Sequence, residues 1–145
     1  MNFLDALHTS SSGLTAQRVR MNVISSNLAN MNTTRTSEGG PYRRKDAVFG
    51  AQPVRQSFQN MLRAQKGPEI SGVRVLGIFL DPRPPISKYD PQHPDADEHG
   101  YVSLPNISPI EEMVNMISAT RSYGAGVAAI NATKNMALKA LAIGQ

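Results

Sequence analysis

The sequence predicts a mainly α-helical protein with a small β-rich insert, in which long N- and C-terminal helices pack as a coiled-coil-like pair. Two observations predict this fold class. Apolar residues recur at seven-residue intervals near both chain ends, and nearly every proline lies between those ends. We therefore expect a discontinuous helical domain formed by residues 1–34 and 107–145, and a Pro/Gly-rich β domain formed by residues 35–106.

The N-terminal zone carries an a/d heptad pattern. Its first apolar line consists of Leu7, Leu14, Met21 and Leu28, and the adjacent line of Phe3, Ile24 and Met31. Ser10 and Gln17 interrupt the second line, so the seam is too imperfect to form a zipper by itself. We expect a helix over about residues 3–31, ended by side chains that compete for backbone hydrogen bonds: Asn27, Asn30 and Asn32.

The middle zone is expected to form short strands and turns. Each proline removes a backbone donor and fixes φ, so no long helix can cross this zone. The prolines are Pro41, Pro53, Pro68, Pro82, Pro84, Pro85, Pro91, Pro94 and Pro105.

The C-terminal zone opens with a helix-start signal. Ser108 can cap, Pro109 suits the first helical position, and Glu111 can complete a capping box. Counting alternately three and four residues onward gives a seam with seven apolar members out of nine: Met113, Met116, Thr120, Tyr123, Val127, Ile130, Lys134, Ala137 and Leu141. This seam is expected to meet the N-terminal helix.

Small residues gather midway along the second helix: Gly124, Ala125, Gly126, Ala128, Ala129 and Ala132. Glycine inside a helix costs roughly 1 kcal/mol relative to alanine, so we expect close approach of another helix backbone to offset it. Two helices cover only one face of each other, and several apolar or small residues would stay exposed in a monomer: Val19, Val23, Ala29, Ile110, Ile117 and Leu138. Such a surface predicts assembly.

Composition excludes several classes of protein. The absence of cysteine excludes a disulfide framework, a thiolate zinc site and a cysteine nucleophile. No stretch approaches the roughly 18 apolar residues of a membrane-spanning helix. We expect no secretory signal either, because Asp5, His8 and the serines at 10–12 interrupt the N-terminal apolar stretch.

Charge is uneven along the chain. Residues 1–66 carry nine Lys and Arg against three Asp and Glu, whereas the remainder carries six against eight. The densest basic patch, residues 42–45, lacks an accompanying nucleic-acid-binding signature, so we do not expect a nucleic acid partner.

Three other functions remain as alternatives. The loop at 93–99 concentrates His93, Asp95, Asp97 and His99, which could ligate a metal or simply form a turn. The amphipathic N-terminal helix could bind a membrane peripherally, although its first cations, Arg18 and Arg20, come late. No nucleophile elbow, phosphate loop or dinucleotide fingerprint appears, so we expect neither an enzyme nor a cofactor.

Several segments resemble the flagellar axial family of rod and hook proteins. Residues 12–18 (SGLTAQR) and 22–30 (NVISSNLAN) resemble the N-terminal signature shared by the family. The segments at 40–45, 90–102, 111–114 and 117–123 are similar to those of proximal rod members in particular. The resemblance implies a helical inner domain, a β-rich middle domain, and export through the flagellar type III apparatus without a cleaved signal peptide. It also implies a place in the periplasm-spanning basal-body rod, beside the membrane-ring and export-gate junction proteins.

We expect the terminal helices to pack together within a subunit and their outer faces to pack between subunits, forming a torque-transmitting rod. Non-closing head-to-tail contacts of this kind generate helical tubes. The partners would be copies of this chain and other rod proteins. The expected assembly interface is formed by Leu7, Leu14, Met21, Ile24, Leu28, Asn30, Asn32, Met113, Met116, Ile117, Tyr123, Val127, Ile130, Leu138 and Leu141.

Overall fold

A computed structural model describes residues 3–53 and 71–143. The elements follow in the order α1 (Phe3–Ala29), β1 (Lys45–Pro53), β2 (Ser71–Leu80), β3 (Ile86–Tyr89), β4 (Tyr101–Leu104) and α3 (Pro109–Ile143). The protein is therefore mostly helical with a β insert, as the sequence predicts. The described part of the proline-rich zone contains strands and turns and no helix, which confirms the argument from proline.

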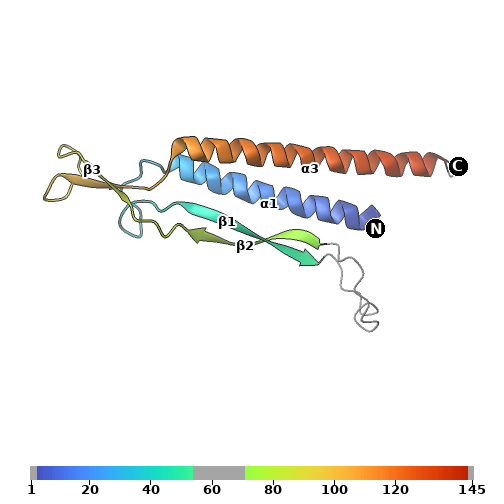
Figure 1. Cartoon of the computed structure of the whole chain (residues 1–145), viewed down its shortest axis with the longest axis horizontal. Helices are drawn as coiled ribbons and strands as arrows, with labels where there is room; N and C mark the ends of the chain where they lie inside the picture. Colours follow the sequence, from blue (N-terminus) through green and yellow to red (C-terminus); the bar gives the residue numbers. More distant parts are fainter. Residues whose placement is uncertain (1–2, 54–70, 144–145) are drawn as a thin grey trace, which may run out of the picture.

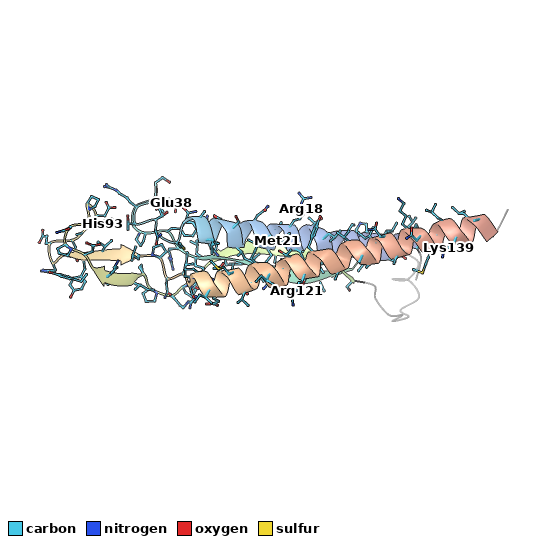
Figure 2. All side chains as sticks on the ribbon, turned by 90° about the horizontal axis from the view of Figure 1, so that it is seen from above. Arg18, Met21, Glu38, His93, Arg121 and Lys139 are labelled. Atoms are coloured by element: carbon cyan, nitrogen blue, oxygen red, sulfur yellow. The ribbon has the colours of Figure 1, made fainter. Side chains whose placement is uncertain are left out.

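The elements form an elongated molecule (Figure 1). Helices α1 and α3 run antiparallel, and the β1–β2 hairpin lies along the other side of α1. Helix α1 is thus the middle layer, in contact with α3 and with both strands. The β3–β4 hairpin lies at one end and both chain termini lie near the other. From above, His93 and Lys139 mark these opposite ends (Figure 2).

Local hydrogen bonds mark the start of α3 and the end of α1. The Ser108 hydroxyl accepts a bond from the Glu111 backbone N–H at 3.4 Å, which places the N-cap of α3 at the predicted residue. Helix α1 ends at Ala29, two residues earlier than expected. Asn30 closes it, because its side-chain amide donates to the Ser26 carbonyl at 2.9 Å and its side-chain oxygen accepts from the Thr33 hydroxyl at 3.2 Å.

The two antiparallel hairpins are separate sheets. Lys45 of β1 pairs with Leu80 of β2, and the register shifts between Val48 and Phe49. The shift is a bulge at Leu76, whose side chain lies over Gly50, where an added Cβ would approach it to 3.0 Å. In the shorter hairpin, Ile86 pairs with Leu104 and Tyr89 with Tyr101.

The hydrophobic core is small. Its buried apolar members are Ala16, Val23, Ile24, Tyr42, Val102, Ile107 and Ala119. The expectation that Val23 would be exposed is wrong, because α1 is covered by the β1–β2 hairpin as well as by α3. Most other large apolar side chains remain partly or largely exposed, so the chain leaves much apolar surface in contact with water.

The line of α3 residues that faces α1 begins at Glu112, whereas the predicted seam begins one residue later, at Met113. Eight of the ten positions that are buried or half-buried follow an alternating spacing of four and three: Glu112, Met116, Ala119, Tyr123, Gly126, Ile130, Thr133 and Ala137. The other two are Asn115 and Val127. Four of the nine predicted seam members lie on this line, namely Met116, Tyr123, Ile130 and Ala137. Of the other five, Val127 is half-buried, and Met113, Thr120, Lys134 and Leu141 are exposed. Counting apolar residues misses the true line because Glu112, Gly126 and Thr133 are not large apolar residues.

Candidate assembly interface

A buried polar junction holds the two helices and the first hairpin together. Asn27 and Glu112 are 0% and 1% exposed, and the Asn27 amide donates to Glu112 Oε2 at 3.0 Å. The same amide donates to the Lys45 carbonyl at 2.8 Å, while Asn27 Oδ1 accepts from the Lys45 N–H at 2.9 Å and from the Tyr42 hydroxyl at 3.2 Å. Asn27 thus makes four hydrogen bonds, which is what a buried amide needs to offset its lost hydration.

Arg44 neutralises the buried carboxylate. Its Nε donates to Glu112 Oε1 at 2.9 Å, and its Nη2 lies 2.8 Å from the same oxygen. Burial of the guanidinium opposes its charge, but the hydrogen bond and the charge of Glu112 outweigh this effect and raise the pKa of Arg44. Glu112 is therefore one half of a buried ion pair, and removing Arg44 would leave its carboxylate without a cation.

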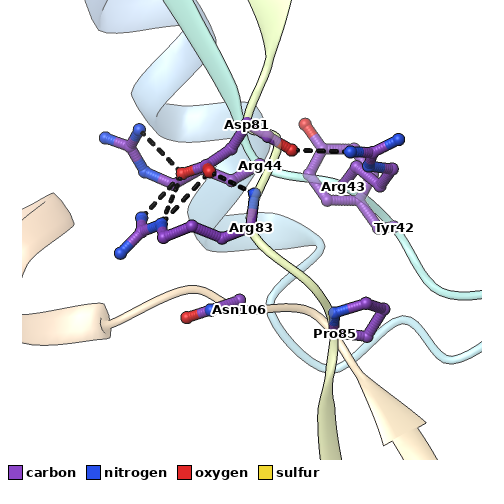
Figure 3. A pocket seen from close by; sticks show the side chains of 7 residues that line it. All are labelled: Tyr42, Arg43, Arg44, Asp81, Arg83, Pro85 and Asn106. Atoms are coloured by element: carbon purple, nitrogen blue, oxygen red, sulfur yellow. Dashed lines mark hydrogen bonds and ion pairs between the residues drawn. The ribbon is translucent and has the colours of Figure 1, made fainter.

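A second ion pair continues the junction to the end of β2 (Figure 3). Arg83 Nη2 lies 2.7 Å from Asp81 Oδ2, and Arg83 Nε donates to both carboxylate oxygens. Arg43 donates to the Asp81 carbonyl at 2.8 Å, and Arg44 lies 3.8 Å from the Asp81 carboxylate. The hydrogen bonds from Arg83 lower the pKa of Asp81 to about 2.

The register of the helix pair is defined by contacts along its length. Besides Asn27 and Glu112, the Thr120 hydroxyl lies 3.7 Å from the sulfur of Met21. Further along, a Cβ added to Gly126 would lie 2.8 Å from Cδ2 of Leu14. In each contact the two residue numbers add to between 139 and 141, so the helices stay in one antiparallel register from the junction outward.

The outer face of α3 is apolar and uncovered. Among the described helices and strands, α3 contacts α1 alone. Ile110, Val114 and Ile117 are 76%, 61% and 55% exposed, and the same face continues past the exposed Arg121 to Ala125, Ala128 and Ala132. This face is the part of the described molecule best suited to bind another protein surface.

The predicted interface residues divide into three groups. Ile24 is buried and seven others are half-buried between the helices or beside them: Leu7, Leu14, Met21, Leu28, Met116, Tyr123 and Ile130. Val127 is also half-buried, and Asn30 is the half-buried cap of α1. Five are exposed, namely Asn32, Met113, Ile117, Leu138 and Leu141.

Leu141 was expected to pack against α1, and this expectation is wrong. It is 71% exposed, because the helix register places residues beyond Ala137 past Phe3, where the described part of α1 begins. Leu14, by contrast, does meet α3 as expected, and it does so at the small-residue segment. The contact at Gly126 is made by a side chain and not by a helix backbone. A Cβ added at Gly124 would meet nothing within 4 Å, so no close contact within the described chain explains a glycine at this position.

Sequence reasoning missed the junction residues Glu112 and Arg44. Asn27 was expected only to cap α1, although it lies before the helix end and binds β1 and α3. Both Glu111 and Glu112 suit the first turn of a helix, so their positions in the sequence do not show which of them is buried. The partner, Arg44, is 68 residues distant and could not be assigned from the sequence alone.

The 93–99 loop is a hydrogen-bonded turn. Asp97 Oδ1 accepts from the backbone N–H groups of Tyr101 and His99 at 2.8 and 2.9 Å, and these bonds lower the pKa of Asp97. His93 Nδ1 accepts from the Asp95 N–H, and Asp95 accepts from the Thr34 hydroxyl at 2.7 Å. Within residues 3–53 and 71–143, no three His, Asp or Glu side chains are grouped closely enough to hold a metal ion.

The two hollows that stand out in the described part of the chain are small. The hollow in Figure 3 has a volume of about 10 Å³, and a more open one beside Asn27 about 240 Å³. Both fall below the roughly 300–1,000 Å³ usual for small-molecule sites. No described helix combines the length and apolar character needed to cross a bilayer.

An extended helix pair with an uncovered apolar face defines a structural assembly protein, and comparison with known proteins specifies its kind. Residues 7–35 match the family model "Flagella basal body rod protein", and residues 98–143 match "Flagellar basal body rod FlgEFG protein C-terminal". The chain is 48% identical to the flagellar basal-body rod protein FlgC of Bacillus subtilis, over 100% of both chains. Identity to the FlgC proteins of Borreliella burgdorferi and Escherichia coli O6:H1 is 46% and 39%, covering 98–100% of each chain.

The chain therefore belongs to the FlgC family of flagellar basal-body rod proteins. It is a structural subunit of the bacterial flagellar rod and not an enzyme.

Proposed function

We propose that this chain polymerises through its terminal helices, with copies of itself and with other rod proteins, into the drive shaft that transmits torque. The single observation that carries this proposal is the uncovered apolar face of α3. Within this scheme, residues 1–34 and 107–145 act as the polymerisation domain and residues 35–106 as the β-rich domain.

The composition of α3 supports burial on more than one side. Its 35 residues include five charged side chains: Glu111, Glu112, Arg121, Lys134 and Lys139. Glu112 is already buried, and twelve consecutive residues between Arg121 and Lys134 carry no charge. A helix that is apolar or small around most of its circumference is typical of one surrounded by protein.

We propose coiled-coil-like packing for the pair itself. The alternating four- and three-residue spacing of the α3 positions that face α1 supports it. The outward residues Met113, Ile117, Leu138 and Leu141 would then pack between subunits. In this scheme the apolar face of α3 of one copy packs against a different surface of the next copy, and heterologous contacts of this kind need not close.

We also propose a location and an export route for this chain. Full-length similarity to the FlgC proteins supports a place in the proximal rod, next to the membrane-ring and export-gate junction proteins. It also supports export through the flagellar apparatus without signal cleavage. Mass spectrometry of the chain in purified basal bodies tests this, since a chain lacking its first 15 or more residues, roughly the length of a cleaved signal, contradicts it.

Ile117→Asp tests the assembly face. Ile117 is exposed, so the isolated chain should keep its stability within about 0.5 kcal/mol. In the rod, a charged aspartate would replace a buried apolar side chain at every subunit, with Arg121 one turn away as its nearest cation, and this should abolish rods and swimming. Ile117→Leu is the matched control and should swim normally. Electron microscopy of basal bodies provides the readout, and normal rods from Ile117→Asp cells would overturn the proposal.

A further inference from the structure

A polar cleft of about 240 Å³ lies beside the buried junction, where α1, the start of β1 and the start of α3 meet. Seven of the nine residues that line it are polar or charged. Asn27 and Arg44 are two of the seven, and they already make their hydrogen bonds within the junction. Five polar side chains therefore remain for a ligand: Arg20, Lys45, Asp46, Glu111 and Asn115. The space suits a few water molecules or a molecule with few non-hydrogen atoms.

Three hydrogen-bond donors line this cleft without an acceptor. Arg20, Lys45 and Asn115 are half-buried, and within residues 3–53 and 71–143 none of these side chains makes a hydrogen bond or an ion pair. The Lys45 ammonium lies over the Tyr42 ring, 5.5 Å from its centroid. Half-buried cations have lost part of their hydration, so an anionic acceptor stabilises them. The planar guanidinium of Arg20 matches the geometry of a carboxylate in particular.

Two carboxylates line the same cleft nearer to solvent. The side chain of Asp46 is 64% exposed, and Glu111 is exposed as well. Asp46 accepts from the Ala47 N–H at 2.9 Å and lies 3.6 Å from Arg44. The Glu111 carboxylate makes no hydrogen bond or ion pair with the described part of the chain. Carboxylates in such positions can accept charge-assisted hydrogen bonds from an ammonium group.

The balance of these charges decides the class of ligand. The charge of Arg44 is matched by the buried Glu112, which leaves two cations and two anions to face the cleft. The two acids would repel a simple anion, and the two bases would repel a simple cation. A small molecule that carries both charges satisfies both pairs. Because the donors are half-buried and the acids are exposed, its carboxylate would point inward and its ammonium group outward.

We propose that this cleft binds a free α-amino acid, with its carboxylate on Arg20, Lys45 and Asn115 and its ammonium group on Asp46 and Glu111. The site goes beyond the proposed function, because it needs no second protein molecule. The small volume favours an amino acid with a short side chain. The bound molecule would bridge α1, β1 and α3, and it would stabilise the folded chain by mass action because unfolding separates these groups.

Titration of the purified, isotope-labelled chain with glycine, acetate and methylammonium tests the site by NMR at constant ionic strength. Glycine should shift the amide resonances around the cleft. It should bind about tenfold more tightly than acetate or methylammonium, since each of these carries only one of the two charges. Arg20→Gln should weaken glycine binding about tenfold. Arg18→Gln, which removes an exposed cation from the same helix, is the matched control and should change it less than about twofold.

Thermal unfolding provides a second measurement. Glycine at one hundred times its dissociation constant should raise the melting temperature by about 8 °C. Because excluded osmolytes also stabilise folded proteins, the decisive comparison is between variants at one glycine concentration. Arg20→Gln and Glu111→Gln should each show about half of the rise seen with Arg18→Gln. An equal rise in all three variants, or acetate that binds as tightly as glycine, would overturn the amino-acid site and leave the proposed function intact.

Discussion

Replacing Glu112 by glutamine changes the buried junction without changing its volume. Glu112 accepts through both oxygens, with Oε1 bound by Arg44 and Oε2 by Asn27. Glutamine offers one oxygen and one NH₂ group. Either orientation therefore sets a donor against the donor of Arg44 or Asn27, in a site that is 1% exposed.

The expected cost follows from these contacts. Removing one partner of a buried ion pair costs about 3–5 kcal/mol, and an unsatisfied buried donor about 1–3 kcal/mol. Arg44 keeps Asp46 and Asp81 at 3.6 and 3.8 Å, and its side chain is 14% exposed, so the lower limit applies. We expect a loss of about 3 kcal/mol in the free energy of unfolding, equivalent to about 9 °C in the melting temperature of a chain this size.

Glu111→Gln is the matched control. Glu111 is adjacent, carries the same charge and is exposed, so its replacement should cost only the helix-dipole interaction of about 0.3–1 kcal/mol. Thermal unfolding of the purified chain, followed by far-ultraviolet circular dichroism, compares the two variants. Equal melting temperatures for Glu111→Gln and Glu112→Gln would refute the assignment of Glu112 as the central acceptor of the junction.

Two further predictions concern the isolated chain. Because Arg83 lowers the pKa of Asp81 from 3.8 to about 2, the ionised carboxylate stabilises the fold above about pH 4, and this contribution is lost as the pH falls toward 2. Asp81→Asn should flatten that part of the acid dependence in urea unfolding, and an unchanged dependence would contradict the ion pair. Gly124→Ala should stabilise the isolated chain by about 0.5–1 kcal/mol, since nothing lies within 4 Å of the added Cβ. Gly126→Ala should gain less, because Leu14 must move, and a larger gain would contradict the helix register.

Local signals predicted the two terminal helices, the start of α3 and strands and turns in the middle zone, but no boundary of an individual strand. The start of α3 was read from Ser108 and Pro109, and the absence of helix from the described middle zone was read from its prolines. These features depend on hydrogen bonds and steric limits among residues a few positions apart. The end of α1 was placed two residues late because the cap forms at the first suitable asparagine, Asn30.

The facing line of α3 could not be predicted by counting apolar residues. Position 112 faces inward although it carries a carboxylate, because Arg44 and Asn27 arrive from distant parts of the chain to satisfy it. Position 126 faces inward although it is glycine, because Leu14 fills the space. Once position 112 is directed inward, the helix period directs 119, 126 and 133 the same way and leaves Met113 outside.

By itself, the sequence determined that this protein has two long terminal helices, a proline-rich β middle zone and more apolar helix surface than one chain can cover. Those properties follow from residue type and spacing along the chain. Only the tertiary structure decided the helix register, the exposed outer face of α3 and the projecting end at Leu141. A buried carboxylate is tolerated only where a cation and hydrogen-bond donors meet it in space, and the chain brings those groups together only when it folds.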